Sequence, residues 1–425
     1  MKPPPLPLLR SRVVQNSPVY YGWIILLVGT LGMIMTTPGQ TAGVSVFLDK
    51  IIADLGLKRS TVSLMYTLGT LSASFALPFV GRFIDRRGPR IAVIIISSLF
   101  ALACVWMGFV QGAVTLFIGF LLIRALGQGS LSLVSIHIIN IWFVRRRGLA
   151  VGISGIGVAV SVAFAPLLLE LLIREFGWRT AYMLLGALIA VTILPIGAWL
   201  FRGHPERFGL QPDSGLVNEE KPLVEVNRTL AQARSTVTFW LFIAGNFCTS
   251  ALGTGLVFHH YSIMAGNGVD RLEAATVFIA LGFIVAAANF TTGVLVDRAP
   301  PRFLLSAAML FLVSALAFAT NITGQLDLVF YGVLLGLSQG MNGALGATVY
   351  AYYFGREHIG SIKGFAATTS VASSAFGPLL FAVGFEQMGR YAPILLISAL
   401  FPLAVALLAP FIRPPGQVEN EAVSA

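Results

Sequence analysis

Charged side chains are scarce in this sequence. Asp, Glu, Lys and Arg make up 11% of its 425 residues, whereas soluble domains carry roughly 25%. So little charge cannot cover a water-facing surface, which excludes an ordinary soluble protein. Cysteine is also scarce, since the chain has only two. Cys104 and Cys248 both fall in apolar stretches, so they predict neither a disulfide framework nor a metal site.

Several functional motifs are absent from the sequence. The phosphate-binding pattern G-x-x-x-x-G-K-[ST] does not occur, which disfavours a built-in ATPase. No acid–base or nucleophile–base pair falls at one depth of the predicted helices, so we do not expect an enzyme. We also expect no cofactor and no metal.

Apolar residues make up 56% of the chain. A helix needs about 20 apolar residues to cross a bilayer. Runs of about this length lie near 20–46, 60–80, 91–110, 113–142, 148–171, 180–200, 237–262, 272–292, 303–320, 328–353, 360–384 and 392–411. They lack the apolar–polar alternation of barrel strands. The sequence therefore predicts an all-α membrane protein with twelve transmembrane helices.

The net charge of +10 is distributed unevenly. Most Lys and Arg residues lie in segments on the side of the N-terminus, so the positive-inside rule places both termini in the cytoplasm. The basic start MKPPPLPLLRSR is predicted to be a tail, because the apolar run after it is too long for a signal peptide. We expect a multi-pass protein in the lipid bilayer of the plasma (inner) membrane, without nucleic acid as a partner.

A charged turn occurs twice, 212 residues apart: residues 81–90 read GRFIDRRGPR and residues 293–302 read GVLVDRAPPR. Other matched pairs follow in the same order. They are Gln128-Gly129 with Gln339-Gly340, Trp142-Phe143 with Tyr353-Phe354, and Gly148-x-x-x-Gly152 with Gly360-x-x-x-Gly364. Four features at a nearly constant offset indicate that the chain consists of two similar halves, as in many secondary transporters.

The longest polar stretch, residues 202–236, separates the two halves. We therefore predict two pseudo-symmetric six-helix bundles at 20–201 and 237–412, joined by a cytoplasmic linker at 202–236. Cytoplasmic tails are expected at 1–19 and 413–425, and the protein is expected to be a monomer.

The repeated turn resembles the motif G-x-x-x-D-R-x-G-x-R-R of the major facilitator superfamily. Gly81, Asp85, Arg86, Gly88 and Arg90 match it, and the second copy keeps four of these residue types. The resemblance implies the major facilitator fold. It also implies that the turns control the cytoplasmic gate, because an acid there favours the positive end of a neighbouring helix. The residues predicted to do so are Asp85, Arg86, Arg90, Asp297, Arg298 and Arg302.

Four further segments resemble bacterial relatives of monocarboxylate and oxalate/formate carriers: YYGW at 20–23, TPGQTAGVSVF at 37–47, WFVRRRGLAVGI at 142–153 and YFGREHIGSIKG at 353–364. This resemblance implies a small organic anion as substrate, with protons or a counter-anion as a second partner. Such carriers often have an acid and an Arg on helix eight, whereas helix eight here has only Glu273 at its mouth. This departure disfavours simple proton symport and leaves anion exchange open.

Arg124 is the sharpest candidate for a substrate contact. Eleven residues from the start of the fourth helix, at 1.5 Å each, place it about 16 Å deep, near the middle of a core about 30 Å thick. A charge there is costly and normally faces a cavity or a partner. No Asp or Glu is predicted at that depth, so an anionic substrate would complement it. The alternative is a role in packing. The second half has Leu335 at this position.

Other polar residues near mid-depth or at breaks are candidate substrate contacts, although buried amides also tie helices together. Thr37 and Gln40 flank Pro38-Gly39, a pair that predicts a local break in the first helix. His260 and Tyr261 lie near the outer end of the seventh helix. The full set is Arg124, Gln128, Asn246, Gln339, Asn342, Thr37, Gln40, His260 and Tyr261.

Two other functions remain open. A drug or metabolite efflux antiporter of the same superfamily is disfavoured, because the fifth helix reads GISGIGVAVSVAFAPLL and lacks the G-P-x-x-G-G pattern of such antiporters. A membrane sensor without transport would need a soluble output domain, and both predicted tails are short. The sequence therefore favours a secondary active transporter of a small organic anion, probed most directly at Arg124.

Overall fold

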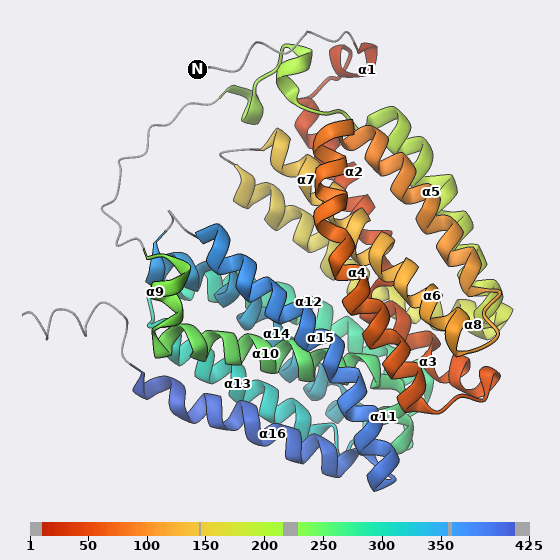
Figure 1. Ribbon diagram of the computed structural model, residues 1–425, viewed down its shortest axis with the longest axis vertical. Coiled ribbons are helices and arrows are strands. Elements are labelled where there is room, and N and C mark those ends of the chain that lie inside the picture. The colour runs from red at the N-terminus through yellow and green to blue at the C-terminus, as the bar shows by residue number, and fades with distance from the viewer. Residues whose placement is uncertain (1–10, 144–145, 216–227, 297, 356–358, 413–425) are drawn as a thin grey trace, which may run out of the picture. The chain divides into compact units, whose positions relative to one another are not determined.

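A computed structural model describes residues 11–143, 146–215, 228–296, 298–355 and 359–412, and these residues form helices and turns without strands. Figure 1 shows the order of the helices. The membrane-spanning elements are α2 (Tyr21–Ile34) with η1 (Thr37–Gly39) and α3 (Thr41–Leu55), α4 (Arg59–Arg87), α5 (Pro89–Met107), α6 (Ala113–Ile123) with η2 (Arg124–Leu131) and α7 (Ser132–Trp142), α8 (Arg147–Leu200), α10 (Val237–Phe258) with α11 (His260–Gly266), α12 (Arg271–Leu295), α13 (Pro301–Phe318), α14 (Gln325–Phe354), α15 (Ile359–Met388) and α16 (Tyr391–Leu408). The shorter elements are α1 (Arg12–Gln15), η3 (Pro205–Phe208), η4 (Pro212–Gly215), α9 (Leu230–Arg234) and η5 (Ala409–Phe411).

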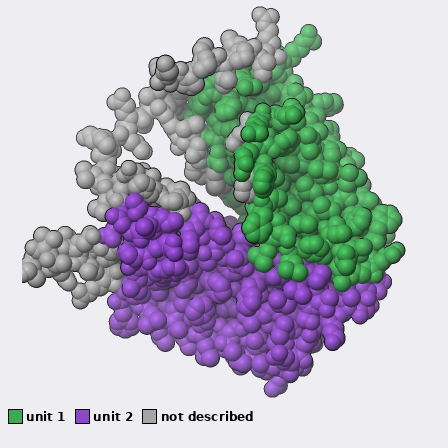
Figure 2. All heavy atoms as spheres, viewed as in Figure 1, with its two compact units in different colours: residues 1–47, 68–161, 171–221 green, residues 48–67, 162–170, 222–425 purple. Residues whose placement is uncertain are grey.

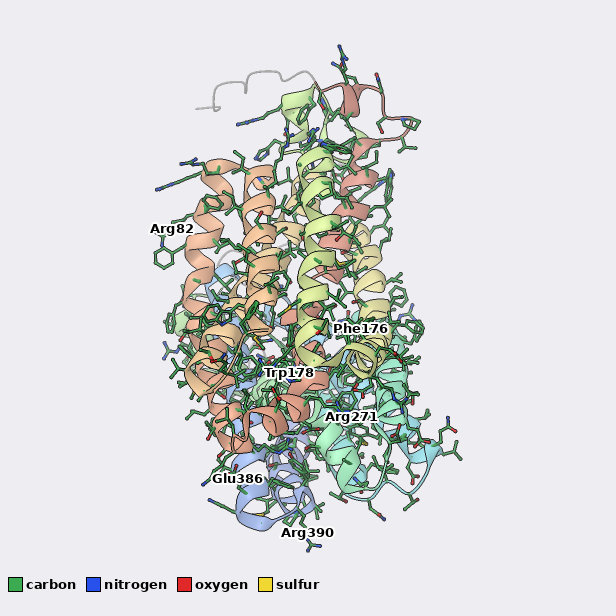
Figure 3. The ribbon with its side chains drawn as sticks, turned by 90° about the vertical axis from the view of Figure 1, so that its right-hand side faces the viewer. Arg82, Phe176, Trp178, Arg271, Glu386 and Arg390 are labelled. Carbon is green, nitrogen blue, oxygen red and sulfur yellow. The ribbon has the colours of Figure 1, made fainter. Side chains whose placement is uncertain are left out.

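The described residues contain 11 helices long and apolar enough to cross a membrane. One of them, α8, has 54 residues and is interrupted at Gly177, where φ is +75°. A glycine adopts this left-handed conformation without strain, so α8 is two spans joined by a sharp turn. Phe176 and Trp178 flank the turn (Figure 3). With this division the predicted twelve-helix membrane fold is confirmed.

The helix ends follow from local sequence. The first repeated segment is helical as far as Arg87, the last residue of α4; Gly88, with φ +81°, then breaks the helix and Pro89 starts α5. Proline suits the first position of a helix because it has no N–H to leave unpaired. The Thr236 hydroxyl accepts from Phe239 N at 3.3 Å at the start of α10, and an Asp270 carboxylate oxygen accepts from Leu272 N at 2.9 Å at the start of α12. Both side chains are N-caps.

The first of two compact units comprises residues 1–47, 68–161 and 171–221 (Figure 2). Within it α2 packs along α7, and α5 packs along α6 and η2. The Tyr21 hydroxyl donates to Leu200 O at 2.8 Å, and Trp142 Nε1 donates to Arg202 O at 3.0 Å. These buried aromatic residues therefore fix the ends of three helices through hydrogen bonds to backbone carbonyls.

The second unit comprises residues 48–67, 162–170 and 222–425. Within it α12 packs along α14, α10 along α15, and α13 along both α14 and α16. A Cβ atom on Gly377 would lie 1.8 Å from Ala251 O, so α15 approaches the backbone of α10 as closely as glycine permits. The unit also includes the ends of helices from the first sequence half, in segments 48–67 and 162–170, which contain the charged residues Asp49, Arg59 and Glu170.

Candidate functional site

The predicted break in the first helix is present, and it lies against a second irregular segment. Between α2 and α3 the chain forms the 3₁₀ turn η1, and η2 is a π-helical stretch between α6 and α7. A Cβ atom on Gly39 would lie 2.2 Å from Ile123 O. Only glycine allows this approach, so Gly39 brings the break directly against the start of η2. Stretches of π-helix occur often at functional sites.

Arg124 opens η2 and is 3% exposed. Its Nη1 donates to Gly39 O at 3.0 Å and to the Thr41 hydroxyl at 3.4 Å, and its Nε donates to the Thr70 hydroxyl at 3.1 Å. The guanidinium thus connects η1, α3 and α4 to the α6–η2–α7 span, and it gives a hydrogen bond to a carbonyl that the break releases. Thr41 and Thr70 are contacts that the sequence did not identify.

The π segment explains a detail of the internal repeat. The helices α6 and α14 start at Ala113 and Gln325, which are 212 residues apart, whereas Gln128 and Gln339 are 211 apart. The first half therefore contains one extra residue between the helix start and Gln128. A π segment is how a helix accommodates one extra residue. Since α14 is one uninterrupted α-helix, this irregularity distinguishes the Arg124 region from its counterpart.

The other candidate residues in the first half of the sequence make separate contacts. The Thr37 hydroxyl donates to Ile34 O at 2.6 Å and shares a hydrogen bond of 3.0 Å with Ser161. Gln40 Nε2 donates to the Thr36 hydroxyl at 3.0 Å. Gln128 lies one turn beyond Arg124, and its Oε1 is buried without a hydrogen-bond partner among the described residues. An unsatisfied buried acceptor is a suitable group to receive a donor from a ligand.

The structure brings two of the predicted amides of the second half together. Asn342 Nδ2 donates to Asn246 Oδ1 at 3.4 Å, and Asn246 Nδ2 donates to Ala366 O at 3.2 Å. Gln339 lies beside Gly253, where a Cβ atom would be 3.3 Å from its Nε2. The amides therefore connect α10, α14 and α15, which is the structural role that buried amides often have. Their contact with a substrate remains a prediction.

His260 and Tyr261 are both 2% exposed and lie in an aromatic cluster. His260 Nε2 donates to Ala274 O at 2.8 Å, and the ring stacks on Tyr331 with centroids 5.9 Å apart. The Tyr261 ring lies 4.6 Å from the guanidinium carbon of Arg271. These contacts are those of packing residues, and a role in substrate binding stays a prediction.

The predicted gating residues are only partly described. Asp297 and the side chain of Asp85 lie outside the described residues. Arg86, Arg90 and Arg298 are exposed, and Arg302 Nη1 donates to Ile412 O at 3.0 Å. The gating role of the repeated turn therefore stays a prediction.

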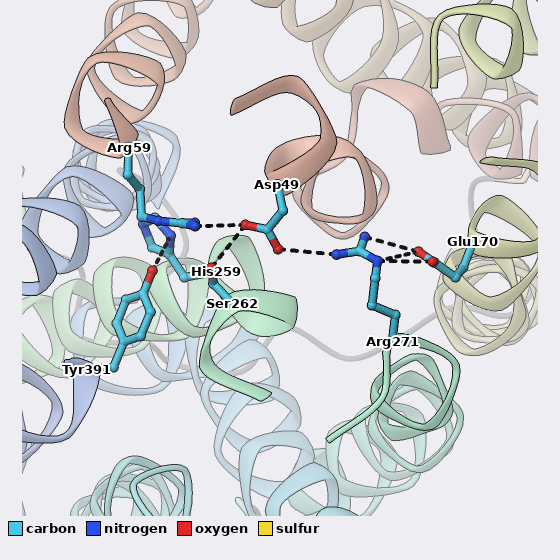
Figure 4. A network of polar contacts seen from close by, with 7 residues as sticks. All are labelled: Asp49, Arg59, Glu170, His259, Ser262, Arg271 and Tyr391. Carbon is cyan, nitrogen blue, oxygen red and sulfur yellow. Dashed lines mark hydrogen bonds and ion pairs between the residues drawn. The ribbon is translucent and has the colours of Figure 1, made fainter. Parts of the chain in front are cut away.

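The second unit also contains an ionic network that no sequence pattern indicates (Figure 4). Arg271 forms a bidentate ion pair with Glu170, with Nε–Oε1 at 3.0 Å and Nη2–Oε2 at 3.1 Å. Its Nη1 also contacts Asp49 Oδ2 at 3.2 Å, and Asp49 Oδ1 accepts from Arg59 Nη2 at 2.9 Å. We call these four residues the outer ionic network, because the predicted topology places their helix ends on the outer side.

The chain is similar to known carriers over most of its length. It is 25% identical to the probable sulfoacetate transporter of Cupriavidus necator over 400 residues, which cover 87% of this chain and 89% of that protein. It is 25% identical to monocarboxylate transporter 4 of Rattus norvegicus, covering 84% and 76% of the two chains. A third relative is the oxalate:formate antiporter of Oxalobacter formigenes, at 27% identity over 41% of each chain. The predicted resemblance to carriers of this type is confirmed.

The fold is also similar to solved structures. A bacterial homologue of the human lysosomal transporter Spinster aligns with a TM-score of 0.69 and 16% identity, over 92% of this chain and 96% of that chain. This likeness supports the fold alone. The sequence profile described as Major Facilitator Superfamily matches residues 29–318 and 260–425. These matches cover most of the chain, and the chain therefore belongs to the Major Facilitator Superfamily.

Proposed function

We propose that this protein is a secondary active transporter that moves a small organic anion, a carboxylate, across the plasma membrane by alternating access. The single observation that carries the substrate class is Arg124, a guanidinium 3% exposed within a membrane-spanning helix. A buried charge in a membrane helix is costly and is commonly functional. A guanidinium also presents a planar fork of N–H donors that matches a carboxylate.

The surroundings of Arg124 support this assignment. The guanidinium lies where η1 meets η2, and two interrupted helices at one depth are typical of transporter binding sites. Its hydrogen bonds to Gly39 O and the Thr70 hydroxyl fix its orientation. The unsatisfied Gln128 Oε1 adds an acceptor one turn away. In the proposed site Arg124 holds the carboxylate, and Gln128 contacts a hydroxyl or a protonated acid group.

The names of the relatives support the same substrate class. Sulfoacetate, monocarboxylates, oxalate and formate share a carboxylate group and a small size. We propose that the gradient of a counter-anion or of protons drives the movement, that both termini are cytoplasmic, and that the protein works as a monomer. In alternating access the two halves rock around a central site and expose it to each side in turn.

Transport by the purified protein in proteoliposomes tests the proposal. Uptake of labelled lactate, pyruvate, oxalate and sulfoacetate would be measured with and without an interior load of an unlabelled carboxylate. We expect saturable uptake of at least one acid, faster after loading if the protein exchanges anions, and faster with an acidic exterior if it is coupled to protons. Saturable uptake of a lipophilic cation, with no uptake of any acid, would refute the carboxylate assignment and favour the efflux alternative.

A further inference from the structure

The outer ionic network connects residues that are far apart in the chain. Asp49 lies in the last turns of α3, Arg59 is the first residue of α4, and Glu170 lies near the end of the first span of α8, before Gly177; all three belong to the first sequence half. Arg271 is the first residue of α12 in the second half, 222 positions from Asp49 and 101 from Glu170. The network therefore joins the ends of three helices of the first half to a helix of the second.

The arrangement favours strong ionic contacts. The Glu170 side chain is 8% exposed and the Arg271 side chain 23%. Bidentate pairs of Arg with a carboxylate are among the strongest hydrogen-bonded contacts in proteins. Two carboxylates and two guanidinium groups form this set, so the four charges balance. Removing one partner of such a poorly solvated pair leaves the charge of the other uncompensated, and this strongly destabilises the conformation that contains the pair.

Further hydrogen bonds connect the ends of α3 and α4 to α11 and α15. The Ser262 hydroxyl donates to Asp49 Oδ1 at 3.0 Å, and Ser60 N donates to Glu386 Oε1 at 2.8 Å. Figure 3 shows Glu386 near the end of α15. The Thr67 hydroxyl, deeper in α4, donates to Ala375 O at 2.7 Å. The first two turns of α4 are therefore attached to α11 through Asp49 and directly to α15.

We propose that the outer ionic network is a latch that holds the outer side of the transporter closed, with the Glu170–Arg271 pair as its central bond. This inference rests on the proposed alternating access, in which the first-half helix ends must separate from α12 in the state open to the outside. While the latch is closed, the four charges satisfy one another. When it opens, water solvates all four, and solvated ion pairs at a surface contribute little energy. Opening therefore exchanges the ionic contacts of the closed state for hydration, so it carries no prohibitive cost.

A reporter cysteine at Ser63 measures whether the latch is open. Arg59, Ser63 and Thr67 are spaced by four residues, so they share one face of α4. Ser63 is fully buried, and it lies between a network residue and the Thr67–Ala375 contact. A cysteine is close to serine in size. The two native cysteines are buried and would be replaced by alanine to remove background labelling.

The experiment follows the rate at which a membrane-impermeant maleimide, added to the outer face of cells, labels the cysteine of the Ser63→Cys protein. We expect Glu170→Gln and Arg271→Gln each to raise the rate about tenfold, the factor that corresponds to 1.4 kcal/mol. Matched controls lie on α8 beside Glu170: Arg174→Gln and Glu175→Gln alter exposed charges and should leave the rate unchanged.

Each outcome decides the proposal. Unchanged labelling in Glu170→Gln and Arg271→Gln would overturn it. Ion pairs that only join rigid helices would not control access of the maleimide to position 63. An equal increase in the controls would overturn it too. If Arg271→Gln does not reach the membrane, Asp49→Asn, which leaves the Glu170–Arg271 pair intact, is expected to raise the rate by a smaller factor, and no rise would refute the latch. Labelling is compared between variants without any measurement of carboxylate transport, so its result does not depend on the carboxylate assignment.

Discussion

Replacing Arg124 with leucine, the residue at the matching position of α14, removes the guanidinium and keeps a side chain suited to a membrane helix. In the structure this guanidinium donates to Gly39 O, Thr41 and Thr70. If it also holds the carboxylate of the substrate, the Arg124→Leu variant loses that contact entirely. We therefore expect Arg124→Leu to lose carboxylate uptake, whereas Arg124→Lys should retain part of it.

The expected magnitude follows from the hydrogen bonds of a charged group, each worth roughly 1.5–3 kcal/mol. Losing a bidentate contact of about 3 kcal/mol weakens substrate binding by about 150-fold. The KM of Arg124→Leu should therefore rise by about 150-fold. Arg124→Lys keeps the charge but replaces the planar fork with one ammonium group. We expect its KM to rise about tenfold.

The assay is initial uptake of a labelled carboxylate into proteoliposomes, over a range of concentrations and normalised to inserted protein. Thr70→Val is the matched control, because it removes one support of the guanidinium and keeps its charge. We expect its KM to rise less than about tenfold, as for the loss of one hydrogen bond. A wild-type KM in Arg124→Leu would refute the substrate contact. Equal loss of uptake in Thr70→Val and Arg124→Leu would show that Arg124 serves the packing of η1 against η2.

Two further predictions concern the packing around the site. Gly39→Ala should lower the apparent melting temperature in detergent, because its Cβ atom would overlap Ile123 O and overpacking costs about 1–3 kcal/mol. The control is Gly152→Ala, which should leave the melting temperature unchanged because the added atom meets open space. Equal melting temperatures of the two variants would contradict the close contact at Gly39. Asn342→Leu should lower the melting temperature by removing its hydrogen bond to Asn246, and it should raise the KM for a carboxylate only if the amide also contacts substrate. A change in KM without any change in stability would instead assign Asn342 to binding alone.

The spans were predictable because each depends on a local property of the sequence. An apolar run of sufficient length forms a membrane helix wherever it occurs, and Pro38-Gly39 marks the break at η1 for the same local reason. The division of α8 was also predictable, since the expected runs end near 171 and resume near 180, on either side of Gly177. The buried position of Arg124 followed from counting residues along its helix.

The contacts between distant residues were not predictable from one sequence. Asp49, Arg59 and Arg271 read as ordinary charges of outer loops, and Glu170 as a charge near a helix end. Their pairing depends on how helices pack, which no local pattern encodes. The π segment was hidden for another reason, because the letters RALGQGSL are compatible with a regular helix. The one-residue change in the repeat offset was visible in the sequence, and it was the signal that could have located η2.

The irregular stretch η2 also bears on how the two halves diverged. The span α6–η2–α7 and its counterpart α14 have the same length, 30 residues each, yet the part of the first span that ends at Gln128 contains one residue more than the part of α14 that ends at Gln339. One inserted or deleted codon accounts for the shift at Gln128, and a second change in the opposite sense restores the offset of 212 at Gly148 and Gly360. Superposing the halves therefore requires a change of register near η2 and a return to the first register before Gly148. The smallest possible change in chain length coincides with the place where one half has an arginine and the other a leucine.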